Sequence, residues 1–406
     1  MYVGAATPYG GRMGRSPVLG TGALAAIERV CDSGLGAQEL LEEVVARIVP
    51  GVGAEAFFAG ATDPETGLCM GAGVVDGMAS SICAPFWDHE FFVPDYNKFS
   101  DLTPERPAAD LHEATGGRVQ RSARWRAFHA ISDLDAEIRV AFHAGGRTWG
   151  VLQLNRHSGA RPFTSEHRDA LARVAPLIGR GLRTAMVNEP AAPDAGRGPG
   201  ILILDERGTI VSCTAEAEAW LAELREGDWC GGASGLPVPI EVFALSLTAA
   251  DRRQPAASRR ARLRTRSGMW LIAHASPLGD GGQVAMVIEP AKASQVAPVI
   301  VEAYGLTARE VDVTRLVARG LKTDEIGAEL FLSPHTVRDH LKAVFEKVGV
   351  SSRGELVSQL FAEHYHSSLD RCVEDGGARV SARLERESAL APRAIDRACE
   401  RIPEHV

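Results

Sequence analysis

The feature that most constrains this chain is a run of closely spaced helix signals between residues 305 and 361. Thr307 followed by Glu310 forms a capping box, which marks the start of a helix. Apolar residues then recur at helical spacing up to Leu321. A second helix begins at Thr323, and the acidic residues in its first turn suit the positive end of the helix dipole. The stretch therefore predicts short helices packed closely together.

A third helix follows after a tight turn. Ser333 provides its N-cap and Pro334 its first helical residue. One side of this helix is apolar, and the opposite side is polar and partly basic. Two helices joined by a few residues, the second polar on its outer face, suit insertion into the major groove of DNA, which admits one helix. A fourth helix from Ser352 to about Phe361 completes a small all-helical domain.

This stretch resembles the DNA-binding domain of LuxR-type, NarL-like transcription factors. The resemblance covers roughly one seventh of the chain, and many fixed positions agree at once. The matching residues are Leu306, Thr307, Arg309, Glu310, Glu325, Ile326, Leu332, Ser333, Thr336, Val337, Arg338, His340, Lys347, Val350 and Arg353. The departures are Thr323, Gly327 and the acidic Asp339, and Gly327 costs about 1 kcal/mol of helix stability relative to Ala.

The resemblance implies roles for individual residues. Those expected to face base edges are Arg338, Asp339 and Lys342. Those expected at phosphates are Thr336, His340 and Lys347, and His335 suits either role. The fourth helix would supply a dimer face through Leu356, Val357 and Leu360. The implied partners are double-stranded DNA in two half-sites, a second copy of the chain and RNA polymerase, without a membrane.

Charge leaves an alternative open. Residues 301–365 carry eight Lys or Arg against ten Asp or Glu, so attraction to phosphates is modest. Positive charge gathers instead between residues 333 and 353, where four cations face two acids. The runner-up interpretation is a signalling or interaction protein whose helical end binds a protein partner. The bland interpretation is a small helical domain whose charges form a solvated face. A third possibility is a GAF-dependent enzyme.

Composition and the absence of several motifs limit the compartment and the activities that the sequence allows. The net charge of −8 requires any DNA contact to be local. No apolar run is long enough to span a membrane, the Gly-rich start is no secretory signal, and the seven Cys are scattered. These features predict a cytoplasmic protein with reduced thiols. No phosphate-binding loop, receiver-type acidic pair or catalytic signature occurs, so we expect neither an enzyme nor a cofactor.

The first half of the chain has the element order of a sensor domain. Amphipathic helical residues 21–49 precede weak strands near 54–61 and 68–78, and residues 84–115 are predicted to be irregular loops and helices. A hairpin with a Gly145-Gly146 turn and a long helix close the unit. The stretch from Trp149 to Leu182 resembles the end of a GAF domain.

Whether this GAF-like unit binds an effector stays open. Asn155, Arg156 and Phe163 resemble a signature of cyclic-nucleotide GAF domains, which many members carry without binding nucleotide. Its aromatic residues would either line a pocket for an unidentified small molecule or fill the core; they are Trp87, Phe91, Phe92, Trp125 and Phe128. Four histidines, His89, His112, His129 and His143, include possible haem ligands, although no Cys/His spacing supports a metal.

The middle of the chain resembles a small PAS domain, with period-2 strands around a short helix. The predicted fold class is therefore multidomain α+β: GAF-like and PAS-like antiparallel sheet domains followed by an all-α four-helix helix-turn-helix domain. The expected division is a disordered leader 1–20, GAF-like domain 21–187, linker 188–199, PAS-like domain 200–291, linker 292–300, helix-turn-helix domain 301–365 and tail 366–406.

A basic cluster lies within the PAS-like part. Residues 251–266 hold seven Arg, which would form either a second patch for DNA backbone or nucleotide, or the solvated face of a strand. The alternation of Arg262, Leu263, Arg264 and Thr265 favours the strand face. The sequence thus predicts a DNA-binding transcription regulator whose activity is modulated by two sensor-like domains.

Overall fold

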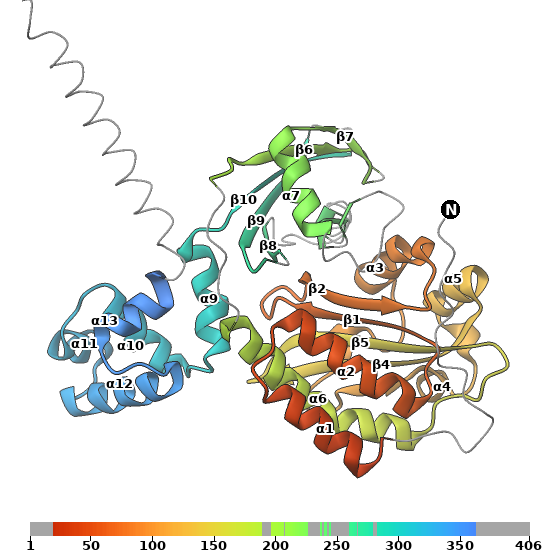
Figure 1. Cartoon of the computed structure of the whole chain (residues 1–406), viewed down its shortest axis with the longest axis horizontal. Helices are drawn as coiled ribbons and strands as arrows, with labels where there is room; N and C mark the ends of the chain where they lie inside the picture. Colours follow the sequence, from red (N-terminus) through yellow and green to blue (C-terminus); the bar gives the residue numbers. More distant parts are fainter. Residues whose placement is uncertain are drawn as a thin grey trace, which may run out of the picture.

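The computed structural model describes residues 19–188, 196–206, 208–225, 236–237, 239–241, 243–244, 260–265, 267–278 and 282–362. Two five-stranded antiparallel sheets are followed by a group of short helices (Figure 1). This architecture confirms the predicted multidomain α+β fold class. The predicted tail and nearly all of the predicted leader lie outside the described residues.

The first sheet is buried on both faces. Its strand order is β2-β1-β5-β4-β3, with β1 Ala56–Thr62, β2 Cys69–Asp76, β3 Ala108–Asp110, β4 Leu134–Ala144 and β5 Arg147–His157. One face packs on α2 Ala37–Val52 and α6 Ser165–Asn188, and α1 Thr21–Cys31 packs on these two helices. The remaining helices of this unit are α3 Cys83–Phe91, α4 Leu111–Thr115 and α5 Ala123–Ser132, of which α4 and α5 contact β4. Single turns η1 Ser80–Ile82, η2 Phe99–Asp101 and η3 Val119–Arg121 join the elements that lie between β2 and β4 in the sequence.

Local sequence explains the central hairpin. Strands β4 and β5 are joined by Gly145 and Gly146, whose φ angles are 61° and 76°. A two-residue hairpin turn with φ above zero at both positions favours glycine, so the predicted Gly-Gly turn is confirmed. Strand β3 was not predicted, because three residues carry too little periodicity to stand out from a segment read as irregular.

Aromatic side chains fill the second face of this sheet. Phe86 and Trp87 pack edge to face against Phe58, and Phe86 stacks on Phe128 at 5.9 Å between ring centroids. A cavity of about 20 Å³ remains beside them. Ligand pockets are usually of roughly 300 Å³ or more, so in this conformation Trp87 and Phe128 form core rather than line an effector pocket, while Phe91, Phe92 and Trp125 are half-buried.

Buried ion pairs hold the same face together. Arg139 on β4 is fully buried and donates to Glu90 at 2.5 Å and to Gln153 at 2.7 Å. Arg124 on α5 is also fully buried and binds both carboxylate oxygens of Glu137, at 2.6 and 2.9 Å. Buried guanidinium groups need such partners, so this network fixes the long segment between β2 and β4 against the sheet.

The second sheet repeats the topology of the first. Its order is β7-β6-β10-β9-β8, with β6 Gly200–Leu204, β7 Ile210–Cys213, β8 Arg260–Arg264, β9 Trp270–Leu278 and β10 Gln283–Pro290. Numbered within each sheet, both orders read 2-1-5-4-3. Helix α7 Ala215–Arg225 packs on β6 and places the fully buried Trp220 in the core of this unit.

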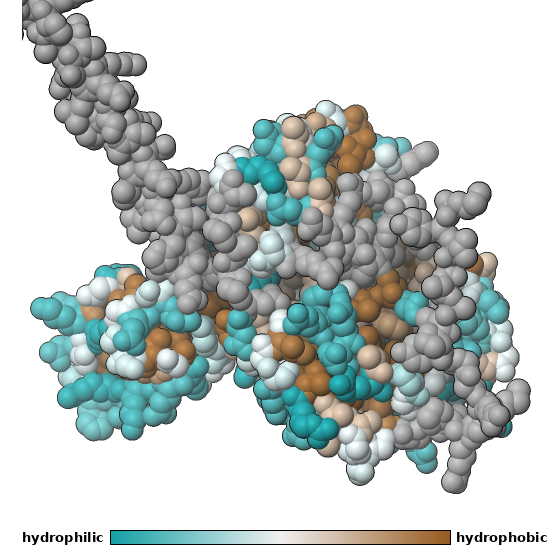
Figure 2. Space-filling view, in the orientation of Figure 1, coloured by the Kyte–Doolittle hydropathy of each residue, from teal (hydrophilic) through white to brown (hydrophobic). Residues whose placement is uncertain are grey.

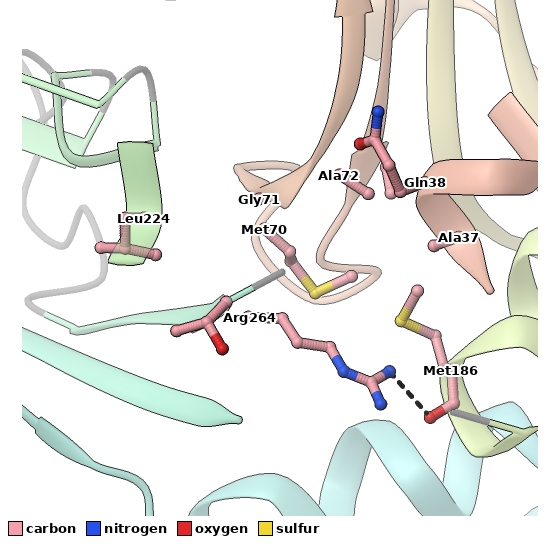
Figure 3. Close-up of a pocket in the computed structure, with 10 residues that line it drawn as sticks. Ala37, Gln38, Met70, Gly71, Ala72, Met186, Leu224 and Arg264 are labelled. Atoms are coloured by element: carbon pink, nitrogen blue, oxygen red, sulfur yellow. Dashed lines mark hydrogen bonds between the residues drawn. The ribbon is translucent and has the colours of Figure 1, made fainter. Parts of the chain in front are cut away.

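The two sheets meet where β2 approaches β8. Arg262 on β8 is paired with Asp63 at 2.7 Å, and its side chain is 10% exposed. Arg264 is buried and donates to the backbone oxygen of Met186 at 3.3 Å (Figure 3). The expectation of a solvated strand face is therefore wrong for these two arginines, because a second domain covers them. Four of the other five arginines of that cluster lie outside the described residues.

The junction is tightly closed. At Gly71, with φ of 136°, an added Cβ would lie 2.2 Å from the carbonyl oxygen of Arg264, so only glycine allows this backbone approach. The cavity in Figure 3 has a volume of about 40 Å³ and is lined by residues of both sheet units, among them Met70, Met186 and Arg264. It has room for about one water molecule and not for an organic ligand.

A helix occupies the segment predicted as the second linker. This α9, Ala293–Ala303, packs on α6 of the first unit and on the last turn of the chain's described part. Five elements follow: α10 Ala308–Ala318, α11 Thr323–Leu330, α12 Pro334–Val348, α13 Arg353–Val357 and the π-type turn η4 Ser358–Ala362. The segment expected as a linker is thus largely helical, because the apolar residues of α9 have two surfaces to pack against. No helix in the described part of the chain has the length and apolar character that a membrane crossing requires.

Candidate nucleic-acid interface

The helix-turn-helix forms as the capping signals predict. Thr307 and Glu310 make a reciprocal capping box at the start of α10, and Ser333 caps α12 by accepting from the backbone N–H of Thr336 at 3.1 Å. The inner face of α12 packs on α10 and α11. The buried residues of α12 are Val337, Leu341, Val344 and Val348. These contacts fix which face of α12 is free.

The free face of α12 is polar, and Figure 2 shows a mainly hydrophilic surface where this helix lies. His335 and Asp339 are paired at 2.9 Å, with side chains 82% and 67% exposed. Lys342 lies 4.0 Å from Glu346 and is 80% exposed. Arg338 is exposed and donates to the backbone oxygen of Pro334 at 3.1 Å. Exposed pairs of this kind contribute little, so these side chains are free to exchange partners.

Lys347 has a different environment. Its ammonium donates to Glu310 at 2.6 Å and to the backbone oxygen of Gly305 at 3.2 Å. Burial alone would raise the pKa of Glu310, but the Lys347 ammonium and the N–H of Thr307 lower it. Lys347 therefore links α12 to the start of α10, while the other predicted phosphate contacts, Thr336 and His340, are half-buried along α12.

Arg353 also has a structural role. Its guanidinium donates to the backbone oxygen of Leu321 and to the hydroxyl of Thr323, both at 2.8 Å. These bonds tie the start of α13 to the loop before α11. Positive charge predicted between residues 333 and 353 is thus divided: Arg338 and Lys342 face outward, whereas Lys347 and Arg353 hold the helices together.

The turn between α11 and α12 contains two unusual positions. An added Cβ at Gly327 would lie 2.7 Å from the carbonyl oxygen of Leu332, so the absence of a side chain there permits the tight turn. Phe331 has a φ of 56° and is 95% exposed. The sequence prediction treated Phe331 only as the end of a helix; an aromatic residue at a turn position where glycine is favoured was the available signal.

The predicted dimer face is covered within the chain. Leu356 is 1% exposed and Leu360 is fully buried, whereas Val357 is half-buried. Helix α9 packs directly on η4, which contains Leu360. In this conformation the two leucines belong to a core that continues through α9 into the first unit. Their predicted role in dimerisation would require α9 to move.

The four histidines considered as haem ligands do not converge. His129 stacks on Trp125, His143 lies 3.2 Å from the hydroxyl of Thr148, and His89 and His112 lie on α3 and α4. Burial lowers the pKa of His89 and of His143. Among the described residues, no group of three His, Cys, Asp or Glu has the geometry of a metal site.

Comparison with known proteins places the helical part in a family. Residues 305–360 match the profile of the luxR family of bacterial regulatory proteins. Over 55 residues the chain is 42% identical to the spore germination protein GerE of Bacillus subtilis, covering 14% of this chain and 74% of that protein. An alignment of 68 residues is 40% identical to the transcriptional regulatory protein NarL of Mycobacterium tuberculosis, covering 17% of this chain and 29% of that protein.

Other relatives share the same short region. An HTH-type transcriptional regulator of Mycobacterium bovis is 48% identical over 54 residues, which are 13% of this chain. The chain spans only 6% of that relative's own length. The sequence similarity therefore concerns the helical domain and not the two sheet units.

Solved structures give weaker likenesses. SdiA in complex with octanoyl-rac-glycerol aligns with 83% of this chain and 92% of its own, at 12% identity and a TM-score of 0.31. The GAF domain of a phosphoenolpyruvate-protein phosphotransferase from Coxiella burnetii aligns with 40% of this chain and 92% of its own, at 13% identity and a TM-score of 0.28.

Proposed function

Since this chain belongs to the luxR family of bacterial regulatory proteins, we propose that it is a transcription regulator that binds a specific double-stranded DNA site through α12. The observation that carries the proposal is the polar outer face of α12, which begins at a capped and exposed helix start. A helix of this kind enters the major groove with its N-terminal residues nearest the base edges.

Three exposed side chains of α12 have a chemistry that DNA recognises. Arg338 and Lys342 are donors suited to guanine, and Asp339 is an acceptor suited to the cytosine amino group. His335 is paired with Asp339, so the two are expected to rearrange together on binding. We propose that Thr336 and His340 contact phosphates. Lys347 would reach a phosphate only after its hydrogen bond to Glu310 is broken.

The test is selection of the purified full chain against random duplex DNA at fixed salt. Enrichment of two related half-sites about one helical turn apart is expected from a homodimer. Failure of the full chain and of a fragment spanning residues 293–362 to enrich any sequence would favour the alternative, a helical domain that binds protein. The fragment's helicity must be confirmed by circular dichroism, so that an unfolded sample is not taken for a negative result.

We further propose that the two sheet units modulate DNA binding through α9. This helix lies between α6 and η4, and Glu302 near its end pairs with Arg147 of the first unit at 2.8 Å. Gly305, directly after α9, lies beside Arg183 of α6. A signal that frees α9 from both α6 and η4 would uncover Leu360, which belongs to the predicted dimer face. Such a signal must have different affinities for the two arrangements.

The proposed division of the chain keeps a GAF-like unit at 21–187, a PAS-like unit at 200–291 and a DNA-binding unit at 301–365. Its support is the pair of sheets with equal topology and the sequence match of the helical part. Helix α9 replaces the linker expected at 292–300. An unidentified effector in the first unit stays part of the proposal, with contact to RNA polymerase as a further step after DNA binding.

A further inference from the structure

Phe331 is the most exposed large apolar side chain among the described residues. It is 95% exposed, while the next most exposed, Val211, has 56% of its surface accessible. Isolated apolar residues on a surface are common, but a nearly fully accessible aromatic ring leaves its whole apolar area in water. Burying such a ring elsewhere in the chain would be stabilising, because it would remove that apolar area from water.

The backbone at Phe331 is also strained. Its φ and ψ angles of 56° and 43° lie in the left-handed region, which favours glycine and admits Asn and Asp. The other two non-glycine residues with positive φ in the described chain are Asn97 and Asp133, which belong to those tolerant types. A bulky aromatic residue at such a position is an outlier, and outliers of this kind concentrate at functional sites.

Phe331 lies close to the start of α12, the helix proposed to enter the major groove. It follows the last residue of α11 and comes two residues before Ser333, the N-cap of α12. The acidic residues Asp324 and Glu325 lie in the first turn of α11, about 10 Å away along the helix axis. Glu329, which is nearer, is paired with Arg319 at 3.0 Å. The exposed ring is therefore only two residues from the capped start of α12.

We propose that Phe331 is a DNA-contacting residue that packs its ring against an apolar surface of the duplex beside the start of α12. This inference rests on the proposed function. Two parts of DNA offer such a surface at the edge of the major groove: the C5-methyl group of thymine and the deoxyribose of the backbone. Phe is among the residues that contact the thymine methyl group in direct readout.

Three variants separate a contact role from a structural one. In Phe331→Gly the backbone strain is relieved, so the thermal midpoint of the full chain should equal or exceed that of the wild type, while DNA affinity falls. Phe331→Ala should lose affinity equally but remain less stable than the Gly variant. Phe331→Tyr, which keeps the ring, should bind nearly as the wild type does.

The binding measurement uses the duplex selected by the wild-type full chain, at fixed salt. Both Phe331→Gly and Phe331→Ala should weaken binding at least fourfold. This factor corresponds to about 0.8 kcal/mol, the free energy of removing one methyl-sized apolar group of the duplex from water. Replacing thymines by uracils one at a time should weaken wild-type binding by a similar factor at one position, with no further effect on Phe331→Ala. If no uracil duplex differs although both variants lose affinity, the surface is deoxyribose.

Two outcomes would overturn the inference. Equal affinity of the wild type and both variants for the selected duplex would show that the ring contacts no DNA, and would favour a protein partner for this surface. A lower thermal midpoint for Phe331→Gly would show that the ring is needed for folding. A wild-type chain that selects no DNA would instead contradict the proposed function itself.

Discussion

At α12, single side chains divide into those that face outward and those that hold helices together. Arg338 donates to the backbone of the exposed Pro334 and Lys342 pairs with the exposed Glu346, whereas Lys347 donates to Glu310, which is 5% exposed. The distinction depends on the direction in which each side chain leaves the helix, whereas the family resemblance assigned all three to DNA. Substitution of an outward-facing residue should therefore affect DNA affinity, whereas substitution of Lys347 should affect folding stability.

Lys342→Ala should weaken specific DNA binding by about 1–3 kcal/mol, because it removes a donor expected to face a base edge. Its ion pair with Glu346 is exposed, so folding stability should change by less than about 0.5 kcal/mol. Titration of the selected duplex measures the first quantity and thermal unfolding the second. Lys98→Ala removes the same charge from the first unit and is the matched control; equal affinities of both variants would contradict the role of Lys342.

Lys347→Ala should mainly destabilise the helical domain, by about 1–3 kcal/mol, because Glu310 would keep a buried charge without its cation. The folded-state pKa of Glu310 is lowered, so the stability from this pair is present above the unfolded pKa of about 4.5 and is lost as the pH falls through the lower folded value. Thermal midpoints measured from pH 7 to pH 3 should fall less steeply in the variant. An unchanged pH profile would show that the pair does not stabilise the fold.

At the scale of elements, the capping residues predicted where the helices of the helix-turn-helix begin. Thr307 with Glu310 and Ser333 with Pro334 define helix starts through local hydrogen bonds, which are visible in sequence. Helix α9 was not predicted, because its apolar residues pack against elements that are distant in the sequence or follow it. Burial of Leu360 depends on that packing, because α9 packs on η4, and no local pattern encodes this contact.

Helix α9 offers a test of control by the sheet units. Glu302→Arg places a cation against Arg147 and should loosen α9 from the first unit. The pair is partly exposed, so the effect should be modest, about 0.5–1 kcal/mol, or a two- to fivefold rise in dimer formation and DNA affinity of the full chain. The double variant Arg147→Glu with Glu302→Arg restores the opposite charges and should return both quantities toward wild type. Sedimentation and DNA titration measure them.

Hydrogen exchange should show that α9 is less protected in Glu302→Arg. If DNA affinity is nevertheless unchanged, α9 is not coupled to the helix-turn-helix. The same affinity without a change in protection would mean that this one contact is too weak to hold α9, and Val299→Asp would then be the stronger perturbation, since Val299 is 2% exposed.

At the scale of the whole molecule, the two sheet units are joined through charge and close backbone contact. Periodicity predicted the strands and the alternation of Arg262 and Arg264, but not the neighbour that covers them. A strand whose polar residues face a second domain has the same alternation as one whose polar residues face water. Only the approach of β2 to β8, which Gly71 permits, distinguishes the two.

Arg262→Ala should weaken the junction by about 1–3 kcal/mol, because the side chain of Asp63 is 2% exposed and would lose its cation. Hydrogen exchange should then rise in β2 and β8 before the rest of either sheet. Arg262→Lys keeps the charge but not the planar fork and should have a smaller effect. Equal exchange in the wild type and Arg262→Ala would show that the sheets are held together by other contacts.

The shared packing of α9 has a consequence for the lifetime of the protein. If α9 leaves η4, apolar side chains that are now at most 5% exposed, Val296, Val299, Ile300 and Ala303, lose part of their cover. Exposed apolar helices are recognised by chaperones and cut by proteases more readily than buried ones. The chain would then be degraded fastest in the state in which it acts, unless a second copy covers the exposed surface. Its output would end by turnover as well as by loss of the signal.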